Sequence, residues 1–373
     1  MKFICEQEKL VRAINIVYKA VSSRTTLPIL KGILITCEAG KNEIHMSASD
    51  LEISIETKTE AIVERSGSIV VSAVYFSDLT RRLPEGNVSV EVNEKDIVET
   101  KSGEVEFTLQ GIPSAEFPRI EEKEEGIHFS LDKEMLNNMI KGTVFAASTE
   151  EARGIITGSL IEVKKEEISM VALDGFRLAL MRERISGNEE KNIIVSARVI
   201  SKIGKLFSET EGEEDVSVTV GEKKVWFSIK ETKIAARLLE GEFIKYKEVL
   251  PKENKTKVKM DRKEVLENVE RAAAIVREGK NSFIRFSVTD EELIVSSRAD
   301  EGTTRGVIKT EKEGENLEIG FNARFLGDML KAIPDKDIVM EFNTSISPCL
   351  VKPTSGNHYE YLILPIRLSS SNI

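Results

Sequence analysis

Three stretches of the chain repeat one pattern: VSAVYFSDLTRRLPEGNVSVEV at residues 71–92, VSARVISKIGKLFSETEGEEDVSVTV at residues 195–220, and FNARFLGDMLKAIPDKDIVM at residues 321–340. Each opens on an apolar residue, a small polar residue and alanine, and continues through apolar residues spaced three or four apart to a run of β type. Ala73, Ala197 and Ala323 lie 124 and 126 residues apart, a period typical of a whole domain and far too long for a solenoid. The sequence therefore predicts a triplicated domain.

Other landmarks follow the same period. Asp50, Asp174 and Asp300 each end an apolar run, and they are again 124 and 126 residues apart. Each repeat also begins with a short strand-like run and then apolar residues at helical spacing, as in Leu10, Ala13, Ile14 and Val17 of the first repeat. Asp132 and Asp261 stand where a helix N-cap is expected in the second and third repeats. Each repeat is therefore predicted to contain two helices.

Short alternating runs lie between the helical stretches. Residues 53–57 and 216–220 place apolar side chains on one face only, which is typical of an antiparallel sheet with one face in solvent. Helices packed on such sheets give an α+β fold, here three tandem copies of one domain. Proline-containing and strongly charged stretches at 113–125 and 251–257 mark the boundaries. We expect domains at residues 1–121, 122–252 and 253–373.

Composition limits the class of protein. The chain has 373 residues, of which 40% are hydrophobic, enough for several cores. It contains no stretch of membrane-span character, and Met1-Lys2-Phe3 leads directly into a strand-like run, so we expect a cytoplasmic protein without a membrane partner. Cys5, Cys37 and Cys349 are odd in number and far apart, which predicts buried free thiols.

No catalytic pattern stands out. The sequence lacks a glycine-rich phosphate loop, the metal-binding spacings of His and Cys, and the Gly-x-Ser-x-Gly motif of a nucleophilic serine. His45, His128 and His358 are scattered singly, as solvated or structural imidazoles would be. We expect a protein that is not an enzyme and needs no cofactor or metal. An enzyme whose site consists of ordinary Asp and Glu residues remains an alternative.

Charge is distributed unevenly. The formal net charge is −10, yet the six helical stretches (8–24, 72–83, 133–148, 196–207, 262–277 and 323–334) together hold 17 Lys or Arg and 7 Asp or Glu. Stretch 196–207 carries Arg198, Lys202 and Lys205 and no acidic residue. Any single surface helix can be rich in lysine, but six equivalent basic helices in an acidic chain favour a ring around a phosphate-bearing cylinder. Such a ring would bind nucleic acid without sequence preference and in a salt-sensitive way.

Six motifs in order resemble a known family. They are LPIL at 27–30, SDLE at 49–52, IPSAEFP at 112–118, ALDGFRLA at 172–179, YKEVLP at 246–251 and YLILPIRL at 361–368. Their order and their residues are similar to those of the bacterial DNA sliding clamp, the beta subunit of DNA polymerase III. The resemblance extends over the entire chain.

The resemblance implies a head-to-tail homodimer of six domains, which an ATP-dependent clamp loader places around duplex DNA. Such a processivity factor hydrolyses nothing itself, and tethers the replicative DNA polymerase and repair proteins to DNA. The DNA-binding residues would be Arg24, Arg198, Lys202 and Lys205, with Lys141 and Arg271 as weaker candidates. A DNA-binding scaffold that does not form a ring is the alternative.

The resemblance also suggests how two chains meet. Domain 1 of one chain would continue a sheet into domain 3 of the other and bury a small apolar patch. The candidates are Phe107 and Leu109 on one side, and Ile275 and Val276 on the other. These residues could equally belong to the cores of their own domains.

A peptide pocket completes what the resemblance implies. In this family a short segment containing Gln and Leu or Phe, carried by the partner proteins, binds between domains 2 and 3. The matching residues here are Ile156, Leu173, Gly175, Phe176, Arg177, Leu178, Ile244, Val249, Asn322, Phe325, Ile346, Leu362, Leu364, Pro365, Ile366 and Arg367. Glu248, Asn281 and the tail Ser369–Ile373 depart from the usual family pattern, which leaves open what the rim of the pocket prefers. Leu173, Leu178 and Ile156 could also be ordinary core residues.

Overall fold

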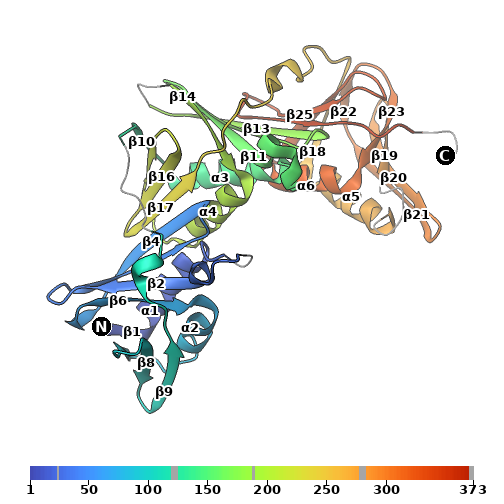
Figure 1. Ribbon diagram of the computed structural model, residues 1–373. Helices are drawn as coiled ribbons and strands as arrows, with labels where there is room; N and C mark the ends of the chain where they lie inside the picture. Colours follow the sequence, from blue (N-terminus) through green and yellow to red (C-terminus); the bar gives the residue numbers. More distant parts are fainter. Residues whose placement is uncertain (23–24, 119–124, 187–189, 277–282, 369–373) are drawn as a thin grey trace. The chain divides into compact units, whose positions relative to one another are not determined.

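The computed structural model (Figure 1) describes residues 1–22, 25–118, 125–186, 190–276 and 283–368. Its described part contains six α-helices, two in each predicted repeat. They are α1 (Gln7–Tyr18), α2 (Ala73–Thr80), α3 (Lys133–Thr143), α4 (Ala197–Glu209), α5 (Arg262–Val276) and α6 (Ala323–Ala332). The chain forms two compact units, Met1–Glu134 with Lys205–Leu238 and Met135–Gly204 with Leu239–Ile373. The helices and antiparallel sheets confirm the predicted α+β class.

The first unit contains two antiparallel sheets. The five-stranded sheet has the order β5 (Ile62–Arg65), β1 (Lys2–Glu6), β7 (Asn87–Val92), β8 (Ile97–Ser102) and β9 (Val105–Gln110). The eight-stranded sheet has the order β10 (Ile127–Leu131), β15 (Val216–Val220), β16 (Lys224–Ile229), β17 (Thr232–Arg237), β4 (Ile53–Glu60), β3 (Glu43–Ser49), β2 (Gly32–Cys37) and β6 (Gly67–Ser72). Strand β9 therefore lies at an edge, where its outer hydrogen-bonding groups can accept another strand.

The second unit also contains two sheets. The nine-stranded sheet has the order β14 (Lys191–Ser196), β11 (Gly158–Val163), β12 (Glu167–Leu173), β13 (Arg177–Arg184), β26 (Tyr359–Ile363), β25 (Cys349–Pro353), β24 (Asp337–Phe342), β18 (Thr256–Asp261) and β22 (Glu311–Glu313). The four-stranded sheet has the order β21 (Gly302–Lys309), β20 (Glu292–Ala299), β19 (Phe283–Val288) and β23 (Leu317–Asn322). Strand β21 is an edge strand as well.

The helices bury the faces that their spacing predicts. Leu10, Ala13, Ile14 and Val17 of α1 are all buried, and the helix packs against β3, β4 and α2. In the third repeat α5 packs against α6 and against β19, β20 and β21. Burying such apolar stripes contributes most of the stability of short helices like these.

Two helix starts are closed by side chains. Asp261 accepts a hydrogen bond from the backbone N–H of Glu264 at 2.9 Å, as the sequence predicts for a cap of α5. Asn322 accepts hydrogen bonds from the N–H groups of Arg324 and Phe325 at the start of α6. The Asn322 side chain therefore stabilises a helix that belongs to the candidate pocket.

The same kind of strand pairing between successive repeats occurs twice in the fold. Strand β17 of the second repeat pairs with β4 of the first, and the N–H of Arg237 donates to the carbonyl of Glu52 at 2.8 Å. In the same way β26 pairs with β13, and the N–H of Leu364 donates to the carbonyl of Phe176 at 2.8 Å. The second and third repeats thus each contribute their last strand to a sheet of the repeat before them.

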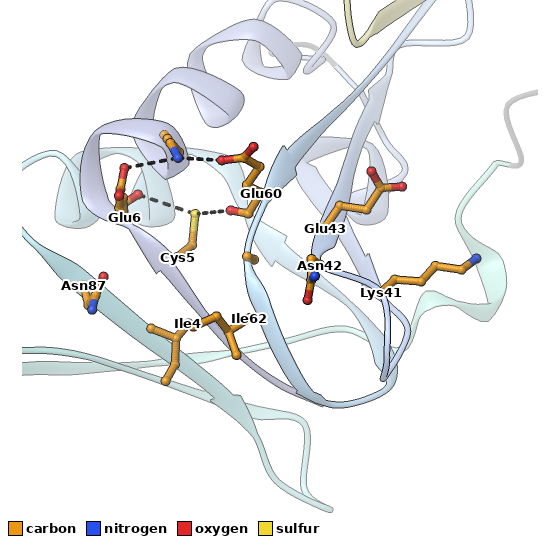
Figure 2. A pocket seen from close by; sticks show the side chains of 11 residues that line it. Ile4, Cys5, Glu6, Lys41, Asn42, Glu43, Glu60, Ile62 and Asn87 are labelled. Atoms are coloured by element: carbon orange, nitrogen blue, oxygen red, sulfur yellow. Dashed lines mark hydrogen bonds and ion pairs between the residues drawn. The ribbon is translucent and has the colours of Figure 1, made fainter.

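The three cysteines are free and buried, as predicted. Cys5 lies in a hollow at the start of the first repeat, where its thiol donates to the carbonyl of Glu60 at 3.3 Å (Figure 2). Burial raises the pKa of the Cys5 thiol to about 11, so the thiol stays protonated near neutral pH. The charges in the hollow are paired, because the Lys9 Nζ lies 2.7 Å from Glu60 and 3.4 Å from Glu6.

Candidate functional site

The candidate pocket is built around a tight turn between β12 and β13. One carboxylate oxygen of Asp174 accepts hydrogen bonds from the N–H groups of Phe176 and Arg177, at 2.9 and 3.0 Å. Gly175 has a φ of 89°, a left-handed value that a residue with a side chain adopts only with strain. Phe176 is pushed outward by this turn and is 53% exposed.

The same turn occurs in the first repeat. Asp50 accepts from the N–H groups of Glu52 and Ile53, at 3.1 and 2.9 Å. Leu51 takes the place of Gly175 there, with a φ of 73°. The first two repeats therefore share this turn down to single hydrogen bonds.

Arg177 is enclosed by acidic and aromatic groups. Its Nε lies 3.0 Å from a carboxylate oxygen of Asp174, and its Nη1 lies 2.9 Å from one of Asp328. The guanidinium carbon lies 4.4 Å from the ring centre of Phe325 and 5.4 Å from that of Phe145. The Arg177 side chain is only 10% exposed, so its charge organises the wall of the pocket.

An apolar cluster forms the base of the pocket. Leu173, Leu178 and Leu362 are buried in it. The side chains of Ile156 and Leu364 are partly buried and pack against it. Phe176 and Phe325 lie side by side, with ring centres 6.2 Å apart. The structure thus brings together residues from β12, β13, α6 and β26.

The remaining predicted pocket residues differ in exposure. Ile244, Val249 and Ile346 are 45%, 47% and 63% exposed. Pro365 and Ile366 are half-buried, Arg367 is exposed, and the N–H of Ile366 donates to the carbonyl of Gly320 at 2.8 Å. Large apolar side chains exposed in this way are typical of a binding surface. Asn281 and residues 369–373 lie outside the described residues.

Several residues of this site were missed at the sequence level. Arg153 donates from its Nη1 to the carbonyl of Asp174, and Asp328 and Phe145 enclose Arg177. Tyr246 belongs to the apolar cluster beneath the pocket. Tyr246 stands in the YKEVLP motif at 246–251, which gave a usable signal, whereas nothing in the local sequence singles out Asp328.

The basic residues occupy helices, as their stretches predict. Arg198, Lys202 and Lys205 follow one another on α4 at intervals of four and three, which places them on one face of the helix. Arg198 and Lys205 are exposed and Lys202 is half-buried. Lys141 on α3 and Arg271 on α5 are exposed, and Arg24 lies outside the described residues.

Acidic residues at the end of α4 and just after it pair with two basic groups in and just after α1. The Nζ of Lys19 lies 2.6 Å from a carboxylate oxygen of Glu209, and the Nη1 of Arg12 lies 3.9 Å from Glu211. Any phosphate that binds Lys19 or Arg12 therefore has to compete with these carboxylates.

The candidate dimer residues fall into two groups. Phe107 and Leu109 are half-buried on the edge strand β9, and Ile275 is half-buried near the end of α5. Val276 is 2% exposed and belongs to the core of its own unit. Ile275 is therefore the better candidate on α5 for contact with another chain.

Two further properties concern the described residues alone. Within the ranges that the structure covers, no group of three or more His, Cys, Asp or Glu is arranged to hold a metal ion. None of the described helices combines the length and the apolar character needed to cross a membrane.

Comparison with known proteins gives one family over nearly the full length. The N-terminal, central and C-terminal domain models of the DNA polymerase III beta subunit match residues 1–121, 130–245 and 247–367. The beta sliding clamp of Bacillus subtilis strain 168 is 32% identical over 98% of this chain and 100% of its own length. That of Staphylococcus aureus strain N315 is 31% identical over 98% of this chain and 99% of its own length.

Solved structures agree. The crystal structure of the Bacillus subtilis sliding clamp superimposes with a TM-score of 0.94 at 32% identity, covering 99% of this chain and 100% of that one. The beta subunit of Thermotoga maritima gives a TM-score of 0.91 at 30% identity, with the same coverage. The chain belongs to the DNA polymerase III beta subunit family, the DNA sliding clamps.

Proposed function

We propose that two copies of this chain close head to tail into a ring around duplex DNA, which holds the replicative polymerase and repair proteins on the template. The observation that carries this proposal is the threefold repeat, matched along the chain by the three domain models of one family. The edge strands β9 and β21 support it, because each can continue a sheet into another chain.

The test combines a mass measurement with retention on DNA. We expect light scattering to give twice the mass of one chain. After loading by a clamp loader, the protein should stay on nicked circular DNA through a gel-filtration column and slide off the same DNA once it is linearised. A monomer, or equal retention on both DNA forms, would indicate a DNA-binding scaffold that does not form a ring.

The DNA contact is proposed to run through basic helix faces, with α4 as the principal one. Reversing the charges of Arg198, Lys202 and Lys205 to Glu should make DNA binding less sensitive to salt. The negative slope of log K against log salt should become shallower by roughly three units, about one for each phosphate that is no longer neutralised. The dimer should remain intact, because these residues belong to α4 and not to the proposed interface strands β9 and β21. Fluorescence anisotropy with a labelled duplex at several salt concentrations measures the slope.

A matched control changes the same amount of charge elsewhere. Lys223, Lys233 and Lys257 are exposed on strands and turns. Reversing all three should weaken binding slightly through the net charge and leave the salt slope nearly unchanged. Equal slopes for the two triple variants would place the phosphate contacts on another surface.

The partner site is proposed to be the pocket around Phe176, Phe325 and Leu364. Apolar side chains provide area for a Leu or Phe of the partner, at about 25 cal/mol per Å² removed from water. The exposed Arg367 offers donors to the polar part of the segment. Arg177 is already paired with Asp174 and Asp328, so we propose that it supports the pocket from within.

We further propose that the chain has no catalytic activity of its own, requires no cofactor and works in the cytoplasm, where DNA is replicated. Loss of a measurable turnover after single carboxylate substitutions would argue for an enzyme instead. The domain boundaries are proposed at 1–121, 122–252 and 253–373.

A further inference from the structure

One segment of the candidate pocket depends on a buried tyrosine. The 241–250 segment carries Ile244 and Val249, two of the exposed apolar side chains of the pocket. Between them Tyr246 is only 4% exposed and packs in the apolar cluster beneath the pocket. The segment therefore presents two side chains outward and anchors itself by a third.

The anchoring side chain, Tyr246, is hydrogen-bonded to a buried carboxylate. The hydroxyl of Tyr246 donates to an oxygen of Glu162 on β11 at 2.5 Å. The same oxygen accepts from the hydroxyl of Ser169 on β12 at 3.1 Å, and the other oxygen lies 3.5 Å from the Nζ of Lys247. Two side chains of the segment thus meet one carboxylate, which is itself held by the sheet.

The protonation states suit a strong hydrogen bond. Burial alone would raise the pKa of Glu162, but the hydrogen bond from Tyr246, the charges of Lys247 and Lys164 and the hydrogen bond from Ser169 outweigh it and lower that pKa. Burial and the neighbouring Glu162 raise the pKa of Tyr246 well above its usual value. A neutral phenol therefore donates to an ionised carboxylate, an arrangement stronger than a bond between neutral groups.

The backbone links this anchor to the pocket. The N–H of Tyr246 donates to the carbonyl of Ile244 at 2.7 Å, and the N–H of Val249 donates to the carbonyl of Tyr246 at 3.1 Å. These short-range bonds fix Ile244 and Val249 relative to the anchored residue. A movement of Tyr246 would therefore move both exposed side chains.

A cavity lies along the segment. It has a volume of about 530 Å³ and is lined by the segment itself together with Leu160, Glu162, Asn192 and Ile194 of β11 and β14. Close packing normally holds a loop in place. Here part of the segment lines this cavity, so the hydrogen bond of Tyr246 adds to the packing of its ring in the apolar cluster.

We infer that Tyr246 and Glu162 are positioning residues of the partner site, which hold Ile244 and Val249 in place without contacting the partner peptide. This inference rests on the proposed peptide-binding function. It assigns part of the affinity for partners to a hydrogen bond beneath the pocket.

The test uses the full-length dimer and a synthetic peptide of the Gln-Leu-Phe type. Tyr246→Phe removes one oxygen and keeps the ring in the core. We expect its peptide Kd to rise about tenfold, which corresponds to about 1.4 kcal/mol. Glu162→Ala should give a similar rise and Glu162→Gln a smaller one, because an amide oxygen still accepts the tyrosine hydrogen bond. The double variant Tyr246→Phe with Glu162→Ala should be no weaker than either single variant.

Two further measurements separate positioning from general stability. Tyr18→Phe, at a partly exposed tyrosine of α1, is the matched control and should leave the Kd unchanged. Hydrogen exchange should be faster in residues 241–250 of Tyr246→Phe than in the unsubstituted protein, and unchanged in the rest of the second unit. A purely structural role would instead lower the melting temperature and leave the Kd of the folded protein as it was.

The outcomes are distinguishable. Peptide binding and exchange in Tyr246→Phe equal to those of the unsubstituted protein overturn the inference and leave the proposed function intact. If the unsubstituted protein does not bind the peptide, the proposed pocket fails. The exchange comparison still decides in that case whether the hydroxyl of Tyr246 holds the segment.

Discussion

Removing residues 364–373 is expected to weaken binding of a Gln-Leu-Phe type peptide strongly while the dimer stays folded. The deletion takes away Leu364, Pro365, Ile366 and Arg367, the part of the pocket that follows β26. It leaves β26 itself, which ends at Ile363, so the nine-stranded sheet keeps all its strands. Removing about 100 Å² of apolar surface from the complex corresponds to about 2.5 kcal/mol. We therefore expect the Kd to rise by roughly 70-fold, since about 1.4 kcal/mol corresponds to a factor of ten.

The control for this deletion removes only residues 369–373, which leaves Leu364 to Leu368 in place. Calorimetric titration of both truncated proteins with the same peptide measures the difference. The longer deletion should also fail to stimulate the polymerase while it is still retained on circular DNA. Undiminished affinity in the longer deletion would contradict the site assignment and leave the ring proposal untouched.

Replacing Phe107 and Ile275 with Asp is expected to give a folded monomer. Both side chains are half-buried in the single chain, Phe107 on the edge strand β9 and Ile275 near the end of α5. A charge placed in a small apolar interface loses its hydration without gaining a partner, which costs several kcal/mol at each of two identical interfaces. Val276 is left unchanged, because its burial inside the unit would make a polar substitution there a test of folding.

The matched control for this pair is Ile62→Asp. Ile62 is 63% exposed on β5, at the opposite edge of the same five-stranded sheet (Figure 2). This variant should remain a dimer by light scattering at the lowest concentration that can be measured. A double variant that also remains dimeric would place the interface on other strands. That variant should then still be loaded onto circular DNA by a clamp loader and retained there.

The repeat and the helices were predictable because they depend on local periodicity. The buried positions of α1 follow directly from apolar spacing, whereas its end does not. The predicted stretch runs to residue 24, but α1 ends at Tyr18, and the N–H of Ser22 then donates to the carbonyl of Leu30. Leu30 belongs to a segment beyond Pro28, so the apolar period of α1 does not predict this hydrogen bond.

The candidate pocket could be proposed from the sequence as a set of residues, but not as a set of interactions. Arg177 pairs with Asp328, 151 residues further along the chain, so local sequence gave no reason to expect an enclosed guanidinium. The burial of Val276 could have been deduced, since Val265, Val269, Ala272 and Val276 recur at helical spacing and form the buried stripe of α5. The role of Tyr246 required the position of Glu162, which lies 84 residues away.

The last strands of the second and third repeats pair with strands of the repeat before them, which has a consequence for synthesis on the ribosome. Thr57 on β4 meets Thr232 on β17, 175 residues later, and Arg182 on β13 meets Asn357 just before β26, again 175 residues later. A nascent chain that has emerged only as far as residue 230 exposes β4 as an open edge, a state in which unpaired strands are prone to wrong association. The partner pocket is completed last, because its base includes Leu362. A growing chain is consequently expected to gain the proposed peptide-binding site only after its third repeat has emerged and folded.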